Sequence, residues 1–223
     1  MMIRAASVAL LAALLGGCAT VPAGTYFPHP GDAATARIAH TLYRAAKAAG
    51  DDPDRYSFAF IKSRTATAYS DEDAVFYVTD GMAGMPQPVL DAVIAHEVAH
   101  EVLGHIGTRR KLSLSLTAGF AVLGGFAPGA GLLDFVVNPL VIRSFSRKQE
   151  LDADRKAVDI LQVMGYQAPR RALADALTAV AAHTPKPKEE PGGLLATHPE
   201  IEERLAALEP LEPTPPVARA VPK

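Results

Sequence analysis

The chain has 223 residues, of which 49% are hydrophobic, and a formal net charge of −2 at pH 7. This length is enough for one domain with a sizeable core. The near-neutral charge gives no support for a nucleic-acid-binding protein, so we expect no nucleic acid among its partners. Cys18 is the only cysteine, which argues against a disulfide framework and against a catalytic thiol.

The first residues have the pattern of a bacterial secretory signal. Residues 1–4 form a short basic segment. Residues 5–15 form an apolar segment that is too short to span a membrane comfortably. The sequence Leu-Gly-Gly-Cys that ends at Cys18 looks like a lipobox. We therefore predict a lipoprotein signal peptide over 1–17 and lipidation at Cys18. The alternative is an ordinary signal peptide with an incidental cysteine.

The residue after Cys18 indicates to which membrane the lipoprotein is sorted. It is Ala19 and not aspartate, which by analogy with bacterial sorting favours the outer membrane, facing the periplasm. We predict a tether over 18–31. An amphipathic helix is predicted over 33–49, and strands over 56–62 and 74–79, where apolar, β-branched and aromatic residues dominate.

Residues 88–105 predict a buried helix that contains the pattern His-Glu-x-x-His. His96 and His100 are four residues apart, so both imidazoles project from one face and can hold one tetrahedral metal ion, usually zinc. Glu97 can act as general base toward water. A solvated helix face is the alternative, but buried histidine and glutamate are costly unless paired or metal-bound. We expect His105 to point away from the metal face.

Residues 149–164 predict a second helix with two acidic residues on one face. Glu150 and Asp154 are four residues apart. A catalytic zinc takes three protein ligands, and Glu150 is the best candidate for the third. Asp154 can accept a hydrogen bond from a ligand histidine and so orient it. The alternative is a charged helix face with i,i+4 pairs to arginine and lysine.

The segment between these helices is unusually apolar. Residues 112–133 contain no charged side chain, but glycines and a proline interrupt them. We predict an apolar helical hairpin there. It could pack in the core, contact a membrane or form a wall of the substrate cleft, and the sequence leaves these three alternatives open.

The C-terminal part predicts two further helices, over 169–182 and 199–208. The loop over 184–197 is rich in proline, lysine and glutamate, which would suit a movable segment, although a plain solvated loop is the alternative. We predict one metallopeptidase domain over 32–209 and a proline-rich disordered tail over 210–223.

Three motifs in a fixed order carry a family resemblance. Over about residues 67–208 the chain resembles the HtpX-type and CAAX prenyl protease family of zinc metallopeptidases. The motifs are His96-Glu97-x-x-His100, Glu150-x-x-x-Asp154, and Thr197-His198-Pro199 followed by Arg204. The resemblance implies an α+β, mostly helical, zincin-like domain with a small sheet, an active-site helix carrying the first motif, and one Zn²⁺ per chain.

The resemblance also implies roles for individual residues. Glu150 would be the third ligand and Glu97 the general base. Arg204 would lie near the active site, where its cation could stabilise an oxyanion. His198 matches a histidine that, in periplasmic relatives, can occupy the open zinc position and repress activity. The alternative for Arg204 and His198 is an ordinary helix start with a surface arginine.

The substrate cleft is less well defined by the resemblance. In zinc peptidases of this architecture the strand before the zinc helix lies beside the cleft, so we expect an extended substrate to pair with the free edge of strand 74–79. Residues 67–70 read Thr-Ala-Tyr-Ser, where relatives often carry Asn-Ala-Phe-Ala.

The implied function is that of a zinc endopeptidase of the bacterial cell envelope. Its substrates would be unfolded or misassembled envelope proteins, and its lipid anchor would hold it on the membrane. Two alternatives remain open. One is an autorepressed or non-proteolytic assembly lipoprotein. The other is a structural lipoprotein whose zinc only stabilises the fold.

Overall fold

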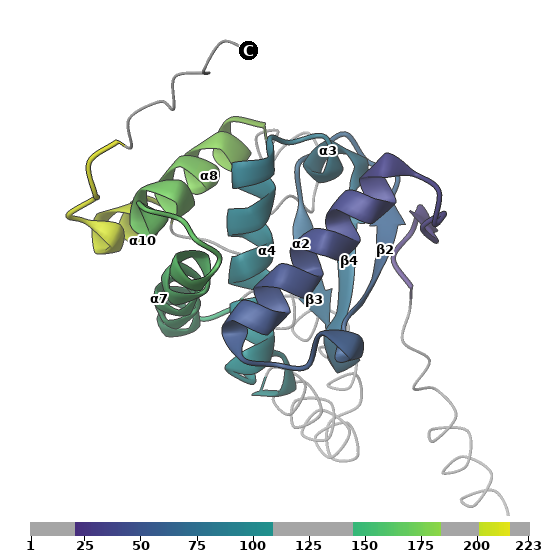
Figure 1. Cartoon of the computed structure of the whole chain (residues 1–223), viewed down its shortest axis with the longest axis horizontal. Helices are drawn as coiled ribbons and strands as arrows, with labels where there is room; N and C mark the ends of the chain where they lie inside the picture. The colour runs from purple at the N-terminus through teal and green to yellow at the C-terminus, as the bar shows by residue number, and fades with distance from the viewer. Residues whose placement is uncertain (1–20, 109–144, 184–200, 215–223) are drawn as a thin grey trace, which may run out of the picture.

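A computed structural model describes residues 21–108, 145–183 and 201–214 (Figure 1). Within these ranges the protein is mostly helical with one small mixed sheet. The predictions for Cys18, residues 112–133 and His198 lie outside the described residues. The elements are β1 (Thr25–Tyr26), α2 (Ala33–Ala49), η1 (Pro53–Arg55), β2 (Ser57–Ile61), β3 (Ala68–Asp71), η2 (Glu72–Ala74), β4 (Val75–Thr79), α3 (Asp80–Ala83), α4 (Gln87–Val102), α7 (Arg147–Val163), α8 (Pro169–His183) and α10 (Ile201–Leu208).

The sheet has the strand order β1-β2-β4-β3. Strands β2 and β4 are parallel, with Phe58 opposite Phe76, and the outer pairs are antiparallel. Strand β4 is therefore paired on both sides, and the expectation that it offers a free edge is wrong. Residues 68–71 fold back against it, with Ser70 opposite Phe76, and take the outer position. The sequence pattern missed this strand because it is only four residues long.

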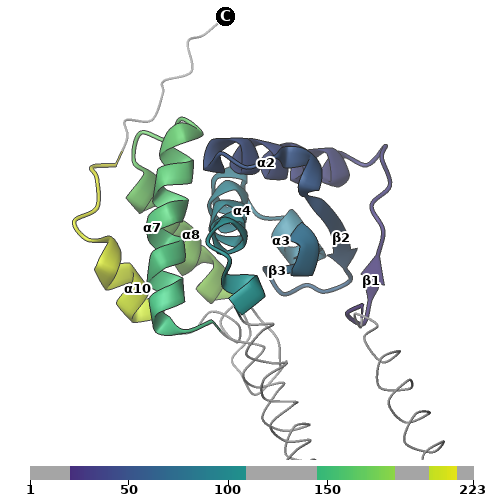
Figure 2. The ribbon, with the colours of Figure 1, turned by 90° about the horizontal axis from the view of Figure 1, so that it is seen from below.

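Helix α4 lies between the sheet and helices α7, α8 and α10 (Figure 2). In Figure 1 α2 crosses in front of the strands, and Figure 2 shows α4 between the sheet and the group α7, α8 and α10. Helix α4 contacts α2, β3, α7 and α8. Every residue from Leu90 to His100 is buried. Because this helix is covered on all sides, its polar side chains need partners within the protein. Those partners form the site described below.

Helix α7 begins at a capping box. The Ser146 hydroxyl accepts a hydrogen bond from the backbone N–H of Gln149, whose side chain accepts one from the Ser146 N–H. This start places Glu150 in the first turn and Asp154 one turn later, and both are buried. Ion pairs on the exposed face of α7 use Asp152 instead. The charged-face alternative therefore does not describe Glu150 and Asp154.

Within the described ranges, none of the helices has the length and apolar character needed to cross a bilayer.

Candidate metal centre

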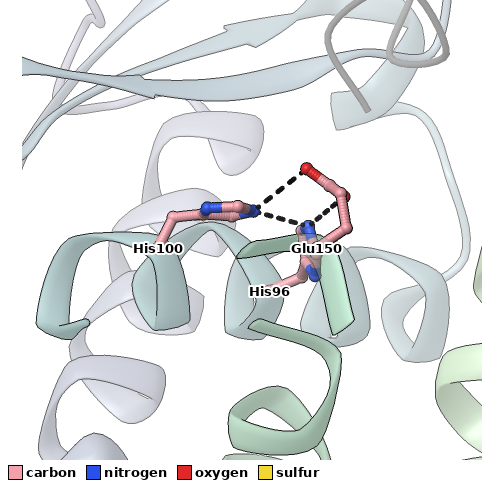
Figure 3. A group of neighbouring side chains, drawn as sticks. All are labelled: His96, His100 and Glu150. Carbon is pink, nitrogen blue, oxygen red and sulfur yellow. Dashed lines mark hydrogen bonds and ion pairs between the residues drawn. The ribbon is translucent and has the colours of Figure 1, made fainter. Parts of the chain in front are cut away.

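Three side chains from α4 and α7 point toward one another (Figure 3). The Nε2 atoms of His96 and His100 are 3.1 Å apart, and each lies 3.5 Å from a carboxylate oxygen of Glu150. An ion held tetrahedrally at 2.0–2.1 Å from each ligand would separate its ligand atoms by about 3.3 Å. The two 3.5 Å distances run to the two different oxygens of Glu150, and all three separations lie close to the value for ligands of one tetrahedral ion.

The charges around these donors also fit a cation. Glu97, Glu150 and Asp154 are buried carboxylates, and Arg204 is a buried guanidinium. At their ordinary ionisation states these four groups carry three negative charges and one positive charge, a formal net charge of −2. Because buried charge is costly unless compensated, a divalent cation suits this set of side chains.

The ring of His96 is held through its second nitrogen. Its Nδ1 lies 3.0 Å from Oδ1 of Asp154. Burial and the charge of Arg204 lower the pKa of His96, but hydrogen bonds with Asp154 and Glu150 outweigh them and raise it above its ordinary value. Asp154 on α7 thus lies beside the second ring nitrogen of His96 on α4, a candidate ligand histidine.

Arg204 connects α10 to the acidic pair on α7. Its Nε and one terminal nitrogen donate to the two oxygens of Asp154 at 2.8 and 2.7 Å, and its other terminal nitrogen lies 3.0 Å from Glu150. Burial raises the pKa of Asp154, but hydrogen bonds from Arg204 and His96 hold it below its ordinary value. Arg204 therefore lies beside the candidate metal centre, with its guanidinium directed at two carboxylates.

Ser70 is a contact of Glu97 that the sequence analysis missed. Its backbone N–H and its hydroxyl both donate to Oε2 of Glu97, at 3.0 and 3.1 Å. Ser70 lies on β3, the outer strand, and Glu97 lies on α4. Their separation of 27 positions in the sequence explains why no local pattern revealed the pair. The departure from the family pattern at residues 67–70 was the only signal.

His105 is placed differently from the expectation. We expected it to point away from the metal face, but its Nδ1 lies 3.0 Å from Nδ1 of His100. That prediction was wrong because α4 ends at Val102, and Gly104, with φ of 68°, turns the chain. The ring of Phe145 stacks on His100 with centroids 3.7 Å apart. Burial lowers the pKa of His105, which favours its neutral form.

Comparison with known proteins agrees with this geometry. The family model described as peptidase family M48 matches residues 32–212. The chain belongs to peptidase family M48. The expected HtpX-type resemblance and the expectation of a metalloprotease are thereby confirmed at the level of the family. The structure supplies the matching feature, a candidate metal site formed by His96, His100 and Glu150.

Several relatives of the family are similar over most of this chain. A protein named Protease HtpX homolog from Polaromonas naphthalenivorans is 32% identical over 175 residues, which cover 64% of this chain and 59% of that protein. Proteins of the same name from Paracidovorax citrulli and Albidiferax ferrireducens are 31% and 29% identical and are covered over 72% and 70% of their lengths. The chain thus spans about three fifths to seven tenths of the relatives it matches.

Proposed function

We propose that this protein is a zinc-dependent endopeptidase with His96, His100 and Glu150 as its metal ligands. The observation that carries the proposal is the convergence of two imidazole nitrogens and a carboxylate, with separations of 3.1 and 3.5 Å. Two histidines and one glutamate are a common ligand set of catalytic zinc, which keeps a further position open for water and substrate. Imidazole ligands suit zinc, and the family resemblance is the reason for proposing it over other divalent ions.

Glu97 is the proposed general base. A bound zinc ion would supply Lewis-acid chemistry, which makes water more acidic and polarises the scissile carbonyl. The carboxylate of Glu97 would take a proton from the attacking water and later deliver it to the leaving amine. Ser70 supports this role because its two hydrogen bonds to Oε2 fix the orientation of the carboxylate. The outer strand β3, which carries Ser70, is the strand beside which an extended substrate would lie.

Asp154 and Arg204 are proposed to act on the ligands. Asp154 would accept the Nδ1 proton of His96 and fix the tautomer that leaves Nε2 for the metal. The two carboxylate contacts of Arg204 support a role in holding Glu150 and Asp154 in place. The role first expected for Arg204, stabilisation of the oxyanion, would require its guanidinium to reach the substrate as well.

The cellular role is proposed from the N-terminal sequence and the family resemblance. The signal over 1–17 and lipidation at Cys18 would anchor the domain to the outer membrane, facing the periplasm. Unfolded or misassembled envelope proteins would then be its substrates, and quality control of the envelope its task.

A repressed or non-proteolytic envelope factor is the alternative. It is favoured by the Thr-His-Pro motif, in which His198 could complete the coordination of zinc and close the open position. In that case His198→Ala would raise proteolysis, whereas an unchanged rate would argue against such a switch.

The first test compares the purified wild-type protein with Glu97→Gln. We expect casein cleavage by the wild type only, with about one zinc in each protein. Loss of the base should lower the rate by about 10²–10⁴-fold because general-base catalysis contributes that much. Wild-type cleavage by Glu97→Gln would refute the mechanism. Zinc in both proteins without cleavage by either would favour the repressed or structural alternatives.

A further inference from the structure

The two candidate ligand histidines differ in what holds their second ring nitrogen. Nδ1 of His96 faces the carboxylate of Asp154, whereas Nδ1 of His100 lies 3.0 Å from Nδ1 of His105. We propose that His105 is a positioning residue, the hydrogen-bond acceptor that orients His100 for metal binding. This inference rests on the proposed function, because it takes His100 as a zinc ligand.

The direction of this hydrogen bond follows from the ligand role of His100. Its Nε2 faces His96 and Glu150 and must be unprotonated to bind a metal. A neutral His100 then carries its proton on Nδ1, so Nδ1 is the donor. Nδ1 of His105 must be the acceptor, which makes His105 a neutral imidazole protonated on Nε2. One proton arrangement thus accounts for the contact between the two Nδ1 atoms and leaves Nε2 of His100 unprotonated for the metal.

The backbone after α4 places His105 in this position. The helix ends at Val102, and Gly104 adopts a left-handed φ of 68°. Residues 105–108 then form a further helical turn, in which the N–H and hydroxyl of Thr108 both donate to the carbonyl of Gly104. His105 is only 8% exposed. A left-handed turn disfavours residues other than glycine, so Gly104 is part of the arrangement.

A second contact restrains the same ring in a different direction. Phe145 stacks on the face of His100 at an interplanar angle of 25°, whereas His105 contacts its edge. Together they fix both the plane of the imidazole and its rotation within that plane. An imidazole acceptor also differs from the carboxylate beside His96 because it adds no negative charge to a centre that already holds three carboxylates.

The deciding experiment measures zinc affinity by competition with a chelator in the full chain. His105→Leu removes the acceptor at similar size, and His105→Asn keeps an acceptor near the position of Nδ1. His40→Leu, an exposed histidine on α2, is the matched control. Because partners of ligand histidines contribute about 10–100-fold to metal affinity, we expect His105→Leu to bind zinc that much more weakly. His105→Asn and His40→Leu should stay within a few-fold of the wild type.

Thermal unfolding of the zinc-free proteins separates positioning from folding. We expect all zinc-free proteins to unfold at similar temperatures, and only His105→Leu to bind zinc more weakly. Unchanged affinity of His105→Leu, or equal weakening by His105→Asn, would overturn the acceptor role. If His105→Leu does not fold, His105→Asn decides, with near-wild-type affinity supporting the role and a large loss overturning it.

The same titration separates this inference from the proposed function. A wild type that binds no zinc would remove the proposed metal centre itself, and the role of His105 with it. A wild type that binds zinc beside an equally tight His105→Leu would overturn the role of His105 alone.

Discussion

Helix α4 carries a buried polar cluster near each of its ends, and the two clusters are built in opposite ways. Near the N-terminal end, Asp91 is the acceptor at which four donors meet. Gln87 donates to it at 2.7 Å, Tyr166 at 2.9 Å, Arg44 at 3.3 Å and Thr41 at 3.4 Å. Donors surround one carboxylate there, so the cluster is satisfied by protein atoms and holds α2, α4 and the turn after α7 together.

Near the C-terminal end the balance is reversed. The Nε2 atoms of His96 and His100 converge with the oxygens of Glu150, and the neighbouring carboxylates outnumber the single guanidinium of Arg204. Burial alone therefore does not distinguish a structural cluster from a chemical one. The two clusters differ in their balance of donors and carboxylates. A site where carboxylates outnumber the positive groups favours a cation.

The largest effect should come from removing a ligand at the metal end. Glu150→Gln keeps the shape of the side chain but takes away its charge. We expect zinc affinity and peptidase activity to fall more than about 100-fold, beyond the loss typical for a residue that only contacts a ligand. Zinc titration and casein cleavage measure both. Asp159→Asn, an exposed acid on the same helix, is the control. Tight zinc binding by Glu150→Gln would exclude Glu150 as a ligand.

Removing Asp91 near the N-terminal end of α4 should lower the stability of the protein and leave zinc binding and peptidase activity unchanged. Asp91→Ala leaves the buried Thr41 hydroxyl and three half-buried donors without their acceptor, which should cost about 3 kcal/mol of unfolding free energy. Urea unfolding measures the loss. Zinc content and activity per folded molecule should match the wild type. Loss of zinc without loss of stability would show that the two clusters are not independent.

A smaller effect is expected where β3 meets α4. Ser70→Ala removes one of two hydrogen bonds to Glu97 and leaves the backbone N–H in place. A hydrogen bond to a charged group is worth about 1.5–3 kcal/mol, so we expect kcat to fall about 10- to 160-fold. KM and zinc content should change little, since the substrate and metal contacts remain. Ser57→Ala, at an exposed site on β2, is the control. An unchanged kcat would argue against orientation of Glu97 by the hydroxyl.

The smallest effect concerns pH at the Asp91 cluster. Burial, with the hydrogen bond to Asp91 and its negative charge, raises the pKa of Tyr166 above its ordinary value of about 10. The folded state then keeps the Tyr166 proton longer than the unfolded state, so this stabilisation is full below about pH 10 and declines at higher pH. The difference in unfolding free energy between wild type and Tyr166→Phe should shrink there. A constant difference across this range would contradict the raised pKa.

The sequence by itself determined what is local. Spacing of four residues placed His96 with His100 and Glu150 with Asp154, because one helical turn brings such positions onto one face. Alternation and composition gave the helices over 33–49 and 169–182 and the two main strands, close to their observed bounds. The motif order also indicated the family, which the match over residues 32–212 confirmed.

Only the tertiary structure decided which faces meet. Spacing could not tell whether Glu150 faced solvent or His100, since both arrangements suit an amphipathic helix; the packing of α7 on α4 settled it. The contact of Ser70 with Glu97 and the outer position of β3 depend on strand pairing between segments that carry no mutual signal. The position of His105 was predicted wrongly because the prediction assumed a continuous helix through Gly104. The backbone turns at that glycine.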